Sequence, residues 1–367
     1  MRKNRIVSLQ QWMKNNDVDS IMLQSRPNNF YITGFDTDPH ERLLAVFLFQ
    51  DKNPFIVCPG MEVNQIQYVF QQGDIVGYSD SENPWEKIQQ QFEKIHISPK
   101  KIAVENALSW QRVREVEGIF PLVELIEVDE AILNERIIKS EDELKILRAA
   151  AKLADFGIKT GVAALEEGVT EMEVLAKIEY ELKKKGVREM SFSTMVLFGE
   201  KAGDPHGNPG DRKLKKGDAV LFDLGVVWEG YCSDITRTVF FDHVKDEDQA
   251  VYETVLKAQE ASLFASKPGN RIALLDKTAR ETISNNGYGD YFPHRIGHGL
   301  GIEVHEFPSM NDQNESLLQP GMTFTIEPGI YIPNQLGVRI EDDVVITETG
   351  FETLTQFPKA LTVVPSR

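Results

Sequence analysis

Four carboxylates interrupt apolar runs of the kind that form β-strands, and they restrict the folds open to this chain more than any other feature. Asp223 lies in "AVLFDLGVVW", Asp234 in "YCSDITRTVFF", Glu327 in "TFTIEPGIYI" and Glu341 in "GVRIEDDVVI". Aspartate is depleted in strands, because it fits poorly among packed apolar side chains. The fold must therefore turn these acids toward solvent or gather them around a cation.

The first two acids lie in a predicted β-hairpin. Two apolar runs flank "WEG", so the mirror point of the hairpin lies near Trp228 and Glu229. Reflection about that point places Asp223 opposite Asp234. Carboxylates that face each other across a strand pair repel, so this arrangement costs stability unless a cation lies between them. The alternative is an ordinary hairpin with both acids on its exposed face.

The last of these strands carries several charges. Alternation with a period of two puts Arg339, Glu341 and Asp343 on one face of a single strand. The four strand acids and a histidine-rich segment all occur in the same part of the chain. Together they indicate a divalent-metal site with mostly oxygen ligands.

The histidine-rich segment is "HRIGHGLGIEVHEF", which contains His294, His298 and His305. The first two are spaced as in helical zinc sites, but the glycines of the segment disfavour a helix and no HExxH motif is present. A helical zinc protease is therefore excluded. The glycines do not fit a dinucleotide-binding loop, and the chain has no Walker A motif. A lone histidine is more often structural than a ligand, so the segment by itself leaves both roles open.

Length and pattern indicate two domains. The 367 residues exceed the usual range of a single core. Residues 1–128 alternate short β-rich runs with helical stretches, which predicts an α/β domain, and residues 129–139 are expected to form a linker. A second domain, residues 140–367, should begin with a long helix, because Ser140 and Glu143 form a capping box ahead of an apolar periodicity.

Composition limits the partners and the compartment. With 40 Lys and Arg against 57 Asp and Glu, the formal charge is −17, which disfavours nucleic acid and favours cations as partners. No run of about 18 apolar residues predicts a membrane span. The start, "MRKNRIVSLQQWMKNN", indicates an amphipathic helix rather than a signal peptide. Cys58 and Cys232 do not suggest a disulfide framework, so we expect a cytoplasmic protein.

Five side chains follow the chain order Asp, Asp, His, Glu, Glu, at Asp223, Asp234, His298, Glu327 and Glu341. With the motifs "FDLG", "SDITRT", "GHGLGIEVHE", "TIEPGIY" and "GVRIED", this order resembles the pita-bread metallopeptidases, which include methionine aminopeptidase, aminopeptidase P and prolidase. The segments "TDPHER" and "HRIGHGLGIEVHEFPS" are most similar to bacterial prolidases, and the resemblance covers essentially the whole chain. It implies an α+β fold, in which a C-terminal pita-bread domain follows a smaller α/β domain of the creatinase type.

The resemblance also implies a dinuclear metal site. Asp234 and Glu341 would bridge two divalent ions. Asp223 would complete the shell of one ion, and His298 and Glu327 the shell of the other. Mn²⁺ is the ion that the resemblance favours, while an oxygen-rich site with one histidine also accepts Co²⁺, Zn²⁺ or Fe²⁺. The implied catalytic residues are Glu327, His305, His294 and His206.

The implied activity is metal-dependent hydrolysis of Xaa-Pro dipeptides, with a hydroxide that the two ions generate from water. The protein would then be a metalloprotease of the prolidase type, and a homodimer as in other members of the family. Two alternatives stay open. An aminopeptidase P would remove the residue before proline from longer peptides, and a metal-free relative would be a binding module or an amidino hydrolase.

Residues that bind the substrate are expected at three places. Arg295 could bind the terminal carboxylate of a dipeptide, or be an ordinary exposed arginine. The segment "DTDPHERLL" lies between two apolar runs, so Asp38, His40 and Arg42 are expected in a loop of the N-terminal domain. That loop could cover an active site, even that of a partner subunit, or be a charged hairpin turn. Arg339 is expected to orient the acidic ligands, with a surface ion pair as the alternative.

Overall fold

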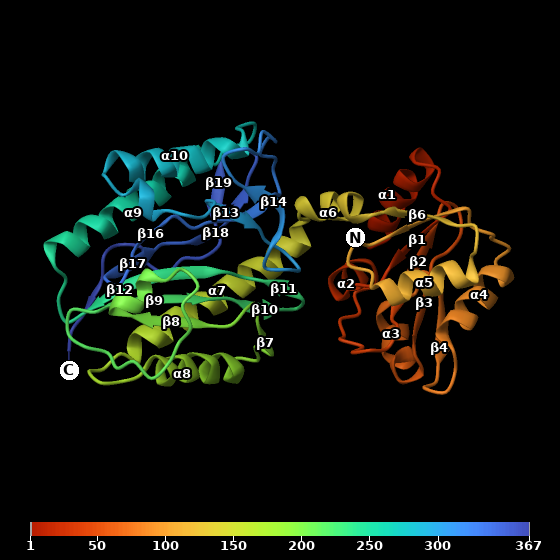
Figure 1. Cartoon of the computed structure of the whole chain (residues 1–367), viewed down its shortest axis with the longest axis horizontal. Helices are drawn as coiled ribbons and strands as arrows, with labels where there is room; N and C mark the ends of the chain where they lie inside the picture. Colours follow the sequence, from red (N-terminus) through yellow and green to blue (C-terminus); the bar gives the residue numbers. More distant parts are fainter. Residues whose placement is uncertain (1, 367) are drawn as a thin grey trace. The chain divides into compact units, whose positions relative to one another are not determined.

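The chain forms two compact units, with the boundary between Arg136 and Ile137. The computed structural model describes residues 2–366, apart from the side chains of residues 2 and 3. The boundary falls within the predicted linker, residues 129–139, most of which forms the helix α6 (Asp129–Ile137) (Figure 1). None of the described helices is both long and apolar enough to cross a membrane.

The first unit is built on one six-stranded sheet, in the order β4-β3-β2-β1-β5-β6. The strands are β1 (Ser20–Leu23), β2 (Ala45–Phe49), β3 (Phe55–Pro59), β4 (Asp74–Tyr78), β5 (Lys101–Val104) and β6 (Glu124–Glu127). Strand β2 is antiparallel to β1 and β3, and the other neighbours are parallel. The helices are α1 (Arg2–Asn15), α2 (Arg26–Thr33), η1 (Gly60–Glu62), α3 (Val63–Val69), α4 (Pro84–Lys94) and α5 (Trp110–Ile119). The α/β fold predicted for this part of the chain is confirmed (Figure 1).

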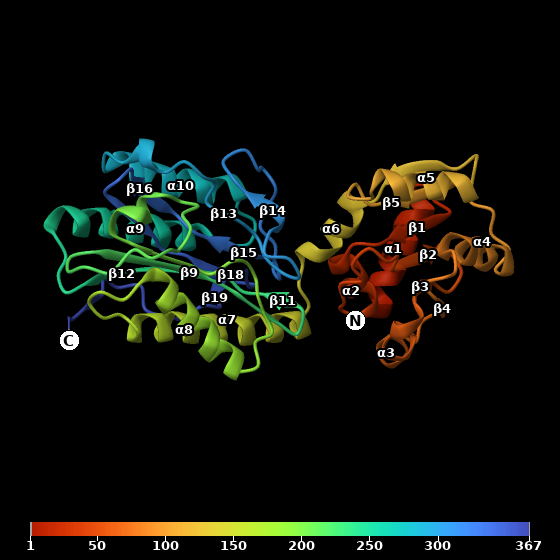
Figure 2. The same ribbon diagram turned by 60° about the horizontal axis from the view of Figure 1, so that its bottom comes forward.

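The second unit places its strands between two pairs of helices. The helices are α7 (Glu141–Ala163), α8 (Glu171–Lys184), α9 (Asp246–Ala265) and α10 (Ile272–Asn285). Helices α7 and α8 lie on one side of the strands, and α9 and α10 lie on the other (Figures 1 and 2). The chain enters α7 through the predicted capping box, in which Ser140 and Glu143 satisfy each other's backbone N–H groups.

The strands of the second unit form four sheets, in the orders β20-β12-β9-β8, β14-β13-β15-β18-β19, β11-β10-β7 and β16-β17. Their bounds are β7 (Glu189–Met190), β8 (Met195–Phe198), β9 (Ala219–Leu224), β10 (Val226–Trp228), β11 (Tyr231–Cys232), β12 (Ile235–Phe241), β13 (Gly297–Gly299), β14 (Glu306–Met310), β15 (Thr323–Ile326), β16 (Gly329–Ile332), β17 (Leu336–Arg339), β18 (Asp342–Ile346), β19 (Phe351–Thr353) and β20 (Val363–Val364). Short 3₁₀ helices η2 (Gly199–Gly203) and η3 (Gly289–Tyr291) connect some of them.

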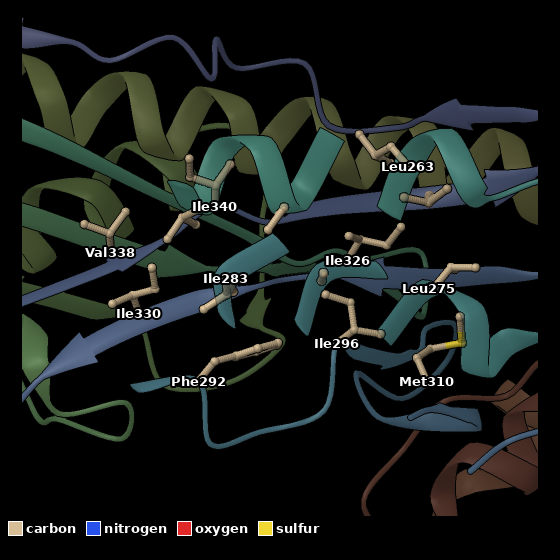
Figure 3. Close-up of a cluster of buried hydrophobic side chains, with 14 of the residues drawn as sticks. Leu263, Leu275, Ile283, Phe292, Ile296, Met310, Ile326, Ile330, Val338 and Ile340 are labelled. Atoms are coloured by element: carbon tan, nitrogen blue, oxygen red, sulfur yellow. The ribbon is translucent and has the colours of Figure 1, made fainter. Parts of the chain in front are cut away.

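Among the described residues, two large apolar clusters pack these strands against the helices. One lies between the strands and the helices α9 and α10, and it includes Leu263, Leu275, Ile283, Ile326 and Val338 (Figure 3). The other packs α7 and α8 against β8, β9 and β12. A carboxylate carried by these strands therefore lies in surroundings of low polarity, where its charge needs a partner.

The predicted register of the first hairpin is wrong by two residues. Asp223 pairs with Thr236 and not with Asp234. The turn consists of Glu229 and Gly230, which have φ angles of 48° and 84°, as a two-residue turn of a tight hairpin requires. The mirror point thus lies between Glu229 and Gly230. Asp234 lies two residues before Thr236, so the two aspartates are diagonal neighbours instead of directly opposite.

The predicted continuous strand through Arg339, Glu341 and Asp343 is also wrong. Strand β17 ends at Arg339, and β18 begins at Asp342. At the break, the N–H of Glu341 donates to the carbonyl of Thr236 at 3.1 Å. The chain passes here from the sheet of β16 to the sheet of β15, so Glu341 lies where strand pairing is interrupted.

Candidate active site

A cavity of about 340 Å³ opens among the strands of the second unit. It is lined by Phe192, Met195, Pro205, His206, Asp223, Asp234, His294, Arg295, His298, Val304, His305, Glu327, Arg339 and Glu341. Ten of the thirteen residues predicted for the site are in this lining. Its volume is at the small end of the range for ligand pockets, which suits a small substrate.

The acids reach the cavity from the ends of strands. Asp223 is near the end of β9, Asp234 immediately precedes β12, and Glu327 immediately follows β15. His298 is the central residue of β13, and Glu341 occupies the break between β17 and β18. Because strand pairing stops at or next to these positions, the side chains can converge without disrupting a long ladder.

Asp234, His298 and Glu341 form the group best arranged to hold an ion. All three are buried, and one ligand atom from each lies within 4.8 Å of the others. The Nε2 atom of His298 lies 3.5 Å from an oxygen of Glu327 and 3.7 Å from one of Asp234. Its Nδ1 lies 3.1 Å from the carbonyl oxygen of Gly299, which fixes Nδ1 as the protonated nitrogen. The lone pair of Nε2 is then directed at the acids, as in a metal ligand.

The carboxylates of the cavity outnumber the protein cations beside them, because four acids share the lining with two arginines, Arg295 and Arg339. Burial, followed by the neighbouring acids, raises the pKa of Asp234 and of Glu341 well above the usual range. Burial also raises the pKa of Glu327 to about 7. Within the described residues, Oδ1 of Asp223 is buried without a hydrogen-bond partner. Four carboxylates and one imidazole, with an orphaned oxygen among them, therefore fit the ligand set of divalent cations.

Arg339 ties two of the acids together. Its guanidinium donates to Asp223 Oδ2 at 2.5 Å, to Thr236 Oγ1 at 2.9 Å and to Tyr331 OH at 2.8 Å. Thr236 in turn donates to an oxygen of Glu341 at 2.6 Å. Arg339 is only 4% exposed, so the alternative of a surface ion pair does not apply. Sequence reasoning missed Thr236 and Tyr331, whose polar atoms lie in otherwise apolar strands.

His294 is engaged on both ring nitrogens. Nδ1 lies 2.8 Å from the carbonyl oxygen of Arg295, and Nε2 lies 2.8 Å from the hydroxyl of Tyr331. Tyr331 accepts a hydrogen bond from Arg339, so its own proton is free to go to Nε2, and Nδ1 carries the proton that faces Arg295. Burial lowers the pKa of His294 to about 4, so the ring is neutral at pH 7. In this state, His294 has no N–H left for a substrate.

His305 has a different environment. Its ring lies edge-on to that of His298, with 4.1 Å between the centroids, and the side chain is exposed to the cavity. Among the described residues, no protein group is hydrogen-bonded to its ring nitrogens. His206 is likewise exposed and follows η2. Both histidines can therefore offer an N–H to a bound molecule.

The expected substrate-binding arginines are in different surroundings. Arg295 lines the cavity, and its guanidinium donates to Ser309 Oγ at 2.9 Å. Arg42 belongs to the first unit, where it pairs with Asp80 at 2.9 Å and with Glu41 at 3.2 Å. The other two predicted residues, Asp38 and His40, lie in the same exposed loop between α2 and β2.

Comparisons with known proteins agree with this geometry. The sequence profile described as "Metallopeptidase family M24" matches residues 145–348, and the profile "Creatinase/Prolidase N-terminal domain" matches residues 5–138. The protein YkvY of Bacillus subtilis is 53% identical over 98% of this chain and 99% of its own length.

Solved structures are similar over the whole chain. The Xaa-Pro dipeptidase from Bacillus anthracis has a TM-score of 0.92 and 30% identity, over 99% of this chain and 100% of that one. The prolidase from Pyrococcus horikoshii has a TM-score of 0.89 and 33% identity, over 98% and 99% of the two chains. The X-Pro aminopeptidase from Thermotoga maritima has a TM-score of 0.88 and 30% identity, over 95% and 98%. The chain therefore belongs to metallopeptidase family M24, and in its sequence a creatinase-type N-terminal domain is followed by a pita-bread domain.

Proposed function

We propose that the protein is an Xaa-Pro dipeptidase that depends on divalent metal ions. The observation that carries this proposal is the convergence of four carboxylates and His298 on one small cavity. Prolidases and an Xaa-Pro dipeptidase are similar to the chain over nearly its full length, which supports the substrate class.

The metal would be held by Asp223, Asp234, His298, Glu327 and Glu341. Their four negative charges balance the four positive charges of two M²⁺ ions. Bound there, the ions would supply an activated water and polarise the scissile carbonyl. An oxygen-rich ligand set with one imidazole suits Mn²⁺, which we propose as the ion, and it also accepts Co²⁺, Zn²⁺ or Fe²⁺.

The protein's own groups would handle the proton and the carbonyl oxygen. Glu327, at the edge of the acid cluster, would carry the proton from water to the prolyl nitrogen that leaves. His305 would donate a hydrogen bond to the carbonyl oxygen as negative charge develops on it. His294 would orient the site through Tyr331, since both of its ring nitrogens are already engaged. His206, which also lines the cavity, would contact the substrate.

Proline at the second position has a physical rationale. The tertiary amide has no N–H, so a site for it needs no acceptor there, whereas an ordinary peptide would bury an unpaired donor. Phe192, Met195, Pro205 and Val304 give the cavity an apolar part that suits the proline ring. Arg295 would bind the terminal carboxylate, because it is the exposed arginine of the cavity.

The remaining parts of the proposal concern assembly and location. We propose a cytoplasmic homodimer, in which the loop with Asp38, His40 and Arg42 lies near the active site of the partner. The resemblance to the prolidase family supports the dimer. Both cysteines are buried and free, which is consistent with a reducing compartment. Sedimentation analysis would test the dimer.

The test is an assay of Leu-Pro hydrolysis after chelation, followed by stepwise addition of single metal ions. We expect no activity after chelation and recovery with Mn²⁺. A second candidate, an X-Pro aminopeptidase, is favoured by the similarity to the enzyme from Thermotoga maritima. A parallel assay of Xaa-Pro-Yaa-Zaa peptides separates the two. Efficient cleavage of the longer peptides with none of Leu-Pro would replace the dipeptidase by the aminopeptidase, and absence of bound or required metal would favour a binding module.

Arg295→Ala and Arg42→Ala probe the binding of the carboxylate. We expect Arg295→Ala to raise the KM for dipeptides by about 10-fold to 100-fold, which is the worth of a charge-assisted hydrogen bond. If neither substitution changes KM, another group binds the carboxylate.

A further inference from the structure

Helix α10 carries an ion pair that faces the histidine segment. Asp276 and Arg280 are one helical turn apart and bind in a bidentate manner, with 2.9 Å from Nε to Oδ1 and 3.3 Å from Nη2 to Oδ2. Asp276 is buried, with 1% of its surface exposed. The pair faces residues 292–296, which lie between η3 and β13 and form neither helix nor strand. Neither Asp276 nor Arg280 lines the cavity.

The pair forms hydrogen bonds with backbone groups of every second residue of this segment. Arg280 donates to the carbonyl oxygens of Phe292 and His294, each at 2.9 Å. Asp276 accepts from the N–H of Ile296 at 2.9 Å. The guanidinium also lies 4.5 Å from the centroid of the Phe292 ring. Backbone groups that an irregular segment would otherwise leave unpaired are thus bound to the helix.

This segment carries His294 and Arg295, which line the cavity described above. The ring of Phe292 meets that of His294 edge-on, with 5.0 Å between the centroids. From His294, hydrogen bonds run through Tyr331 and Arg339 to Asp223. A shift of the backbone at residue 294 would therefore move one end of a chain of contacts that reaches an acid of the cavity.

We propose that the Asp276–Arg280 pair is a positioning device for catalysis. It holds the backbone of residues 292–296 so that His294 stays hydrogen-bonded to Tyr331, and it acts on the reaction only through His294. The inference rests on the proposed function, since its effect is read in peptide hydrolysis. In the sequence, both residues resemble ordinary charged positions of an amphipathic helix, but Asp276 is buried in the structure.

The test is a double-mutant cycle on Leu-Pro hydrolysis. We expect Arg280→Ala to fold and to lower kcat by about 10²-fold, the effect of misplacing a catalytic group by about 1 Å. In the background of His294→Ala, the same substitution should have almost no further effect, because contacts that act through one residue are not additive. Arg280→Lys should fall between, since the single nitrogen of a lysine cannot span the aspartate and the two carbonyls that Arg280 reaches from three separate nitrogens.

Arg148 provides a matched control. It also forms a bidentate pair, with Glu352 at 2.8 and 2.7 Å, and its side chain is 34% exposed against 36% for Arg280. It joins α7 to β19 and does not line the cavity. Arg148→Ala should leave kcat at the wild-type value and should lower the melting temperature less than Arg280→Ala does, because Glu352 is 39% exposed and Asp276 only 1%.

A second readout does not depend on activity. In metal-free protein with ¹³C-labelled histidine, the ring signal of His294 is assigned by its loss in His294→Ala. We expect this signal to shift in Arg280→Ala and in Arg280→Lys, and not in Arg148→Ala. The proposal would be overturned if the His294 ring signal did not shift in Arg280→Ala. It would also be overturned if the losses of kcat in Arg280→Ala and His294→Ala multiplied in the double variant. If Arg280→Ala does not fold, Arg280→Lys is judged by the same two criteria.

Wild-type protein that does not hydrolyse Leu-Pro would refute the proposed function instead. The ring signal of His294 would still decide whether the pair positions this histidine.

Discussion

Glu341 and Asp342 are neighbours in the chain with equal burial and opposite surroundings. They are 2% and 1% exposed. The carboxylate of Asp342 accepts hydrogen bonds from Arg237, Gln259, Thr355 and Lys359. Burial opposes its ionisation, but the two cations outweigh burial and lower the pKa of Asp342 below its usual value. For Glu341, burial and the neighbouring acids together outweigh the nearby Arg339 and raise the pKa.

The difference separates an acid of the fold from an acid of the site. Successive residues of an extended chain point in opposite directions, so one carboxylate meets the charged groups behind the sheet and the other meets the cavity. A buried carboxylate with protein cations beside it is satisfied without help. One without them needs a cation from solution or must take up a proton. Four predictions test this contrast.

The largest expected effect is on activity. Glu341→Gln, or removal of metal by chelation, should lower kcat/KM by at least about 10³-fold, because several kcal/mol of transition-state stabilisation depend on the ions. The metal-free Glu341→Gln protein should be as stable as the metal-free wild type or more so, since a repelling charge is lost. Kinetics and thermal unfolding in the presence of a chelator measure the two effects. A loss of stability in the metal-free variant would show that Glu341 is an acid of the fold.

Asp342→Asn should have the opposite signature. It leaves the buried Arg237 and the partly exposed Lys359 without their counter-charge, so the free energy of unfolding should fall by about 3–5 kcal/mol. Urea unfolding of metal-free protein measures this change. Equal stabilities of Asp342→Asn and Glu341→Gln would break the contrast between the two neighbours.

The residues of the site could be read from the sequence because their types are unusual for their places. An acid inside an apolar strand is visible without a structure, and it points to Asp223 and Asp234. The histidine segment alone leaves both roles open, and only the family resemblance assigns His298 as a ligand. The register of the hairpin could not be read, because "WEG" allows two mirror points and only the positive φ angles of Glu229 and Gly230 decide between them.

Partners that act through hydrogen bonds were also invisible in the sequence. Tyr331 resembles any aromatic residue of a strand, and Thr236 resembles any β-branched one. Arg280 resembles a solvated charge on an amphipathic helix. Their roles follow from contacts with residues 8 to 105 positions away along the chain, which no local pattern encodes.

Arg339 tests how far the site depends on protein cations. Arg339→Lys should lower kcat/KM by about 10-fold to 100-fold with little change in KM, because lysine cannot reach Asp223, Thr236 and Tyr331 together. Metal affinity, measured by calorimetry, should fall as well. Wild-type kinetics and wild-type metal affinity in Arg339→Lys would mean that the acids of the cavity keep their orientation without the guanidinium. In that case, all four acids of the cavity would differ from Asp342 in the way that Glu341 does.

The smallest expected effect is the pH dependence of stability in metal-free protein. The pKa of Glu327 rises from its usual 4.5 to about 7 on folding, so the folded state binds more protons than the unfolded state between these values. Its contribution to stability is complete below pH 4.5 and is lost as pH rises through 7. The lowered pKa of Asp342 acts in the other direction, and its contribution is lost only as pH falls below 3.8.

Between pH 5 and 7.5, the melting temperature of metal-free protein should therefore fall by a few degrees as pH rises, at roughly 2–4 °C per kcal/mol for a unit of this size. Glu327→Gln should reduce that slope, and saturating Mn²⁺ should reverse it, because the ions bind the ionised acids and displace their protons. Calorimetric scans across this range, with and without metal, measure all three slopes. A melting temperature that rises with pH in metal-free protein would mean that the acids of the cavity are ionised without an ion, as Asp342 is, and the distinction between the two neighbours would no longer hold.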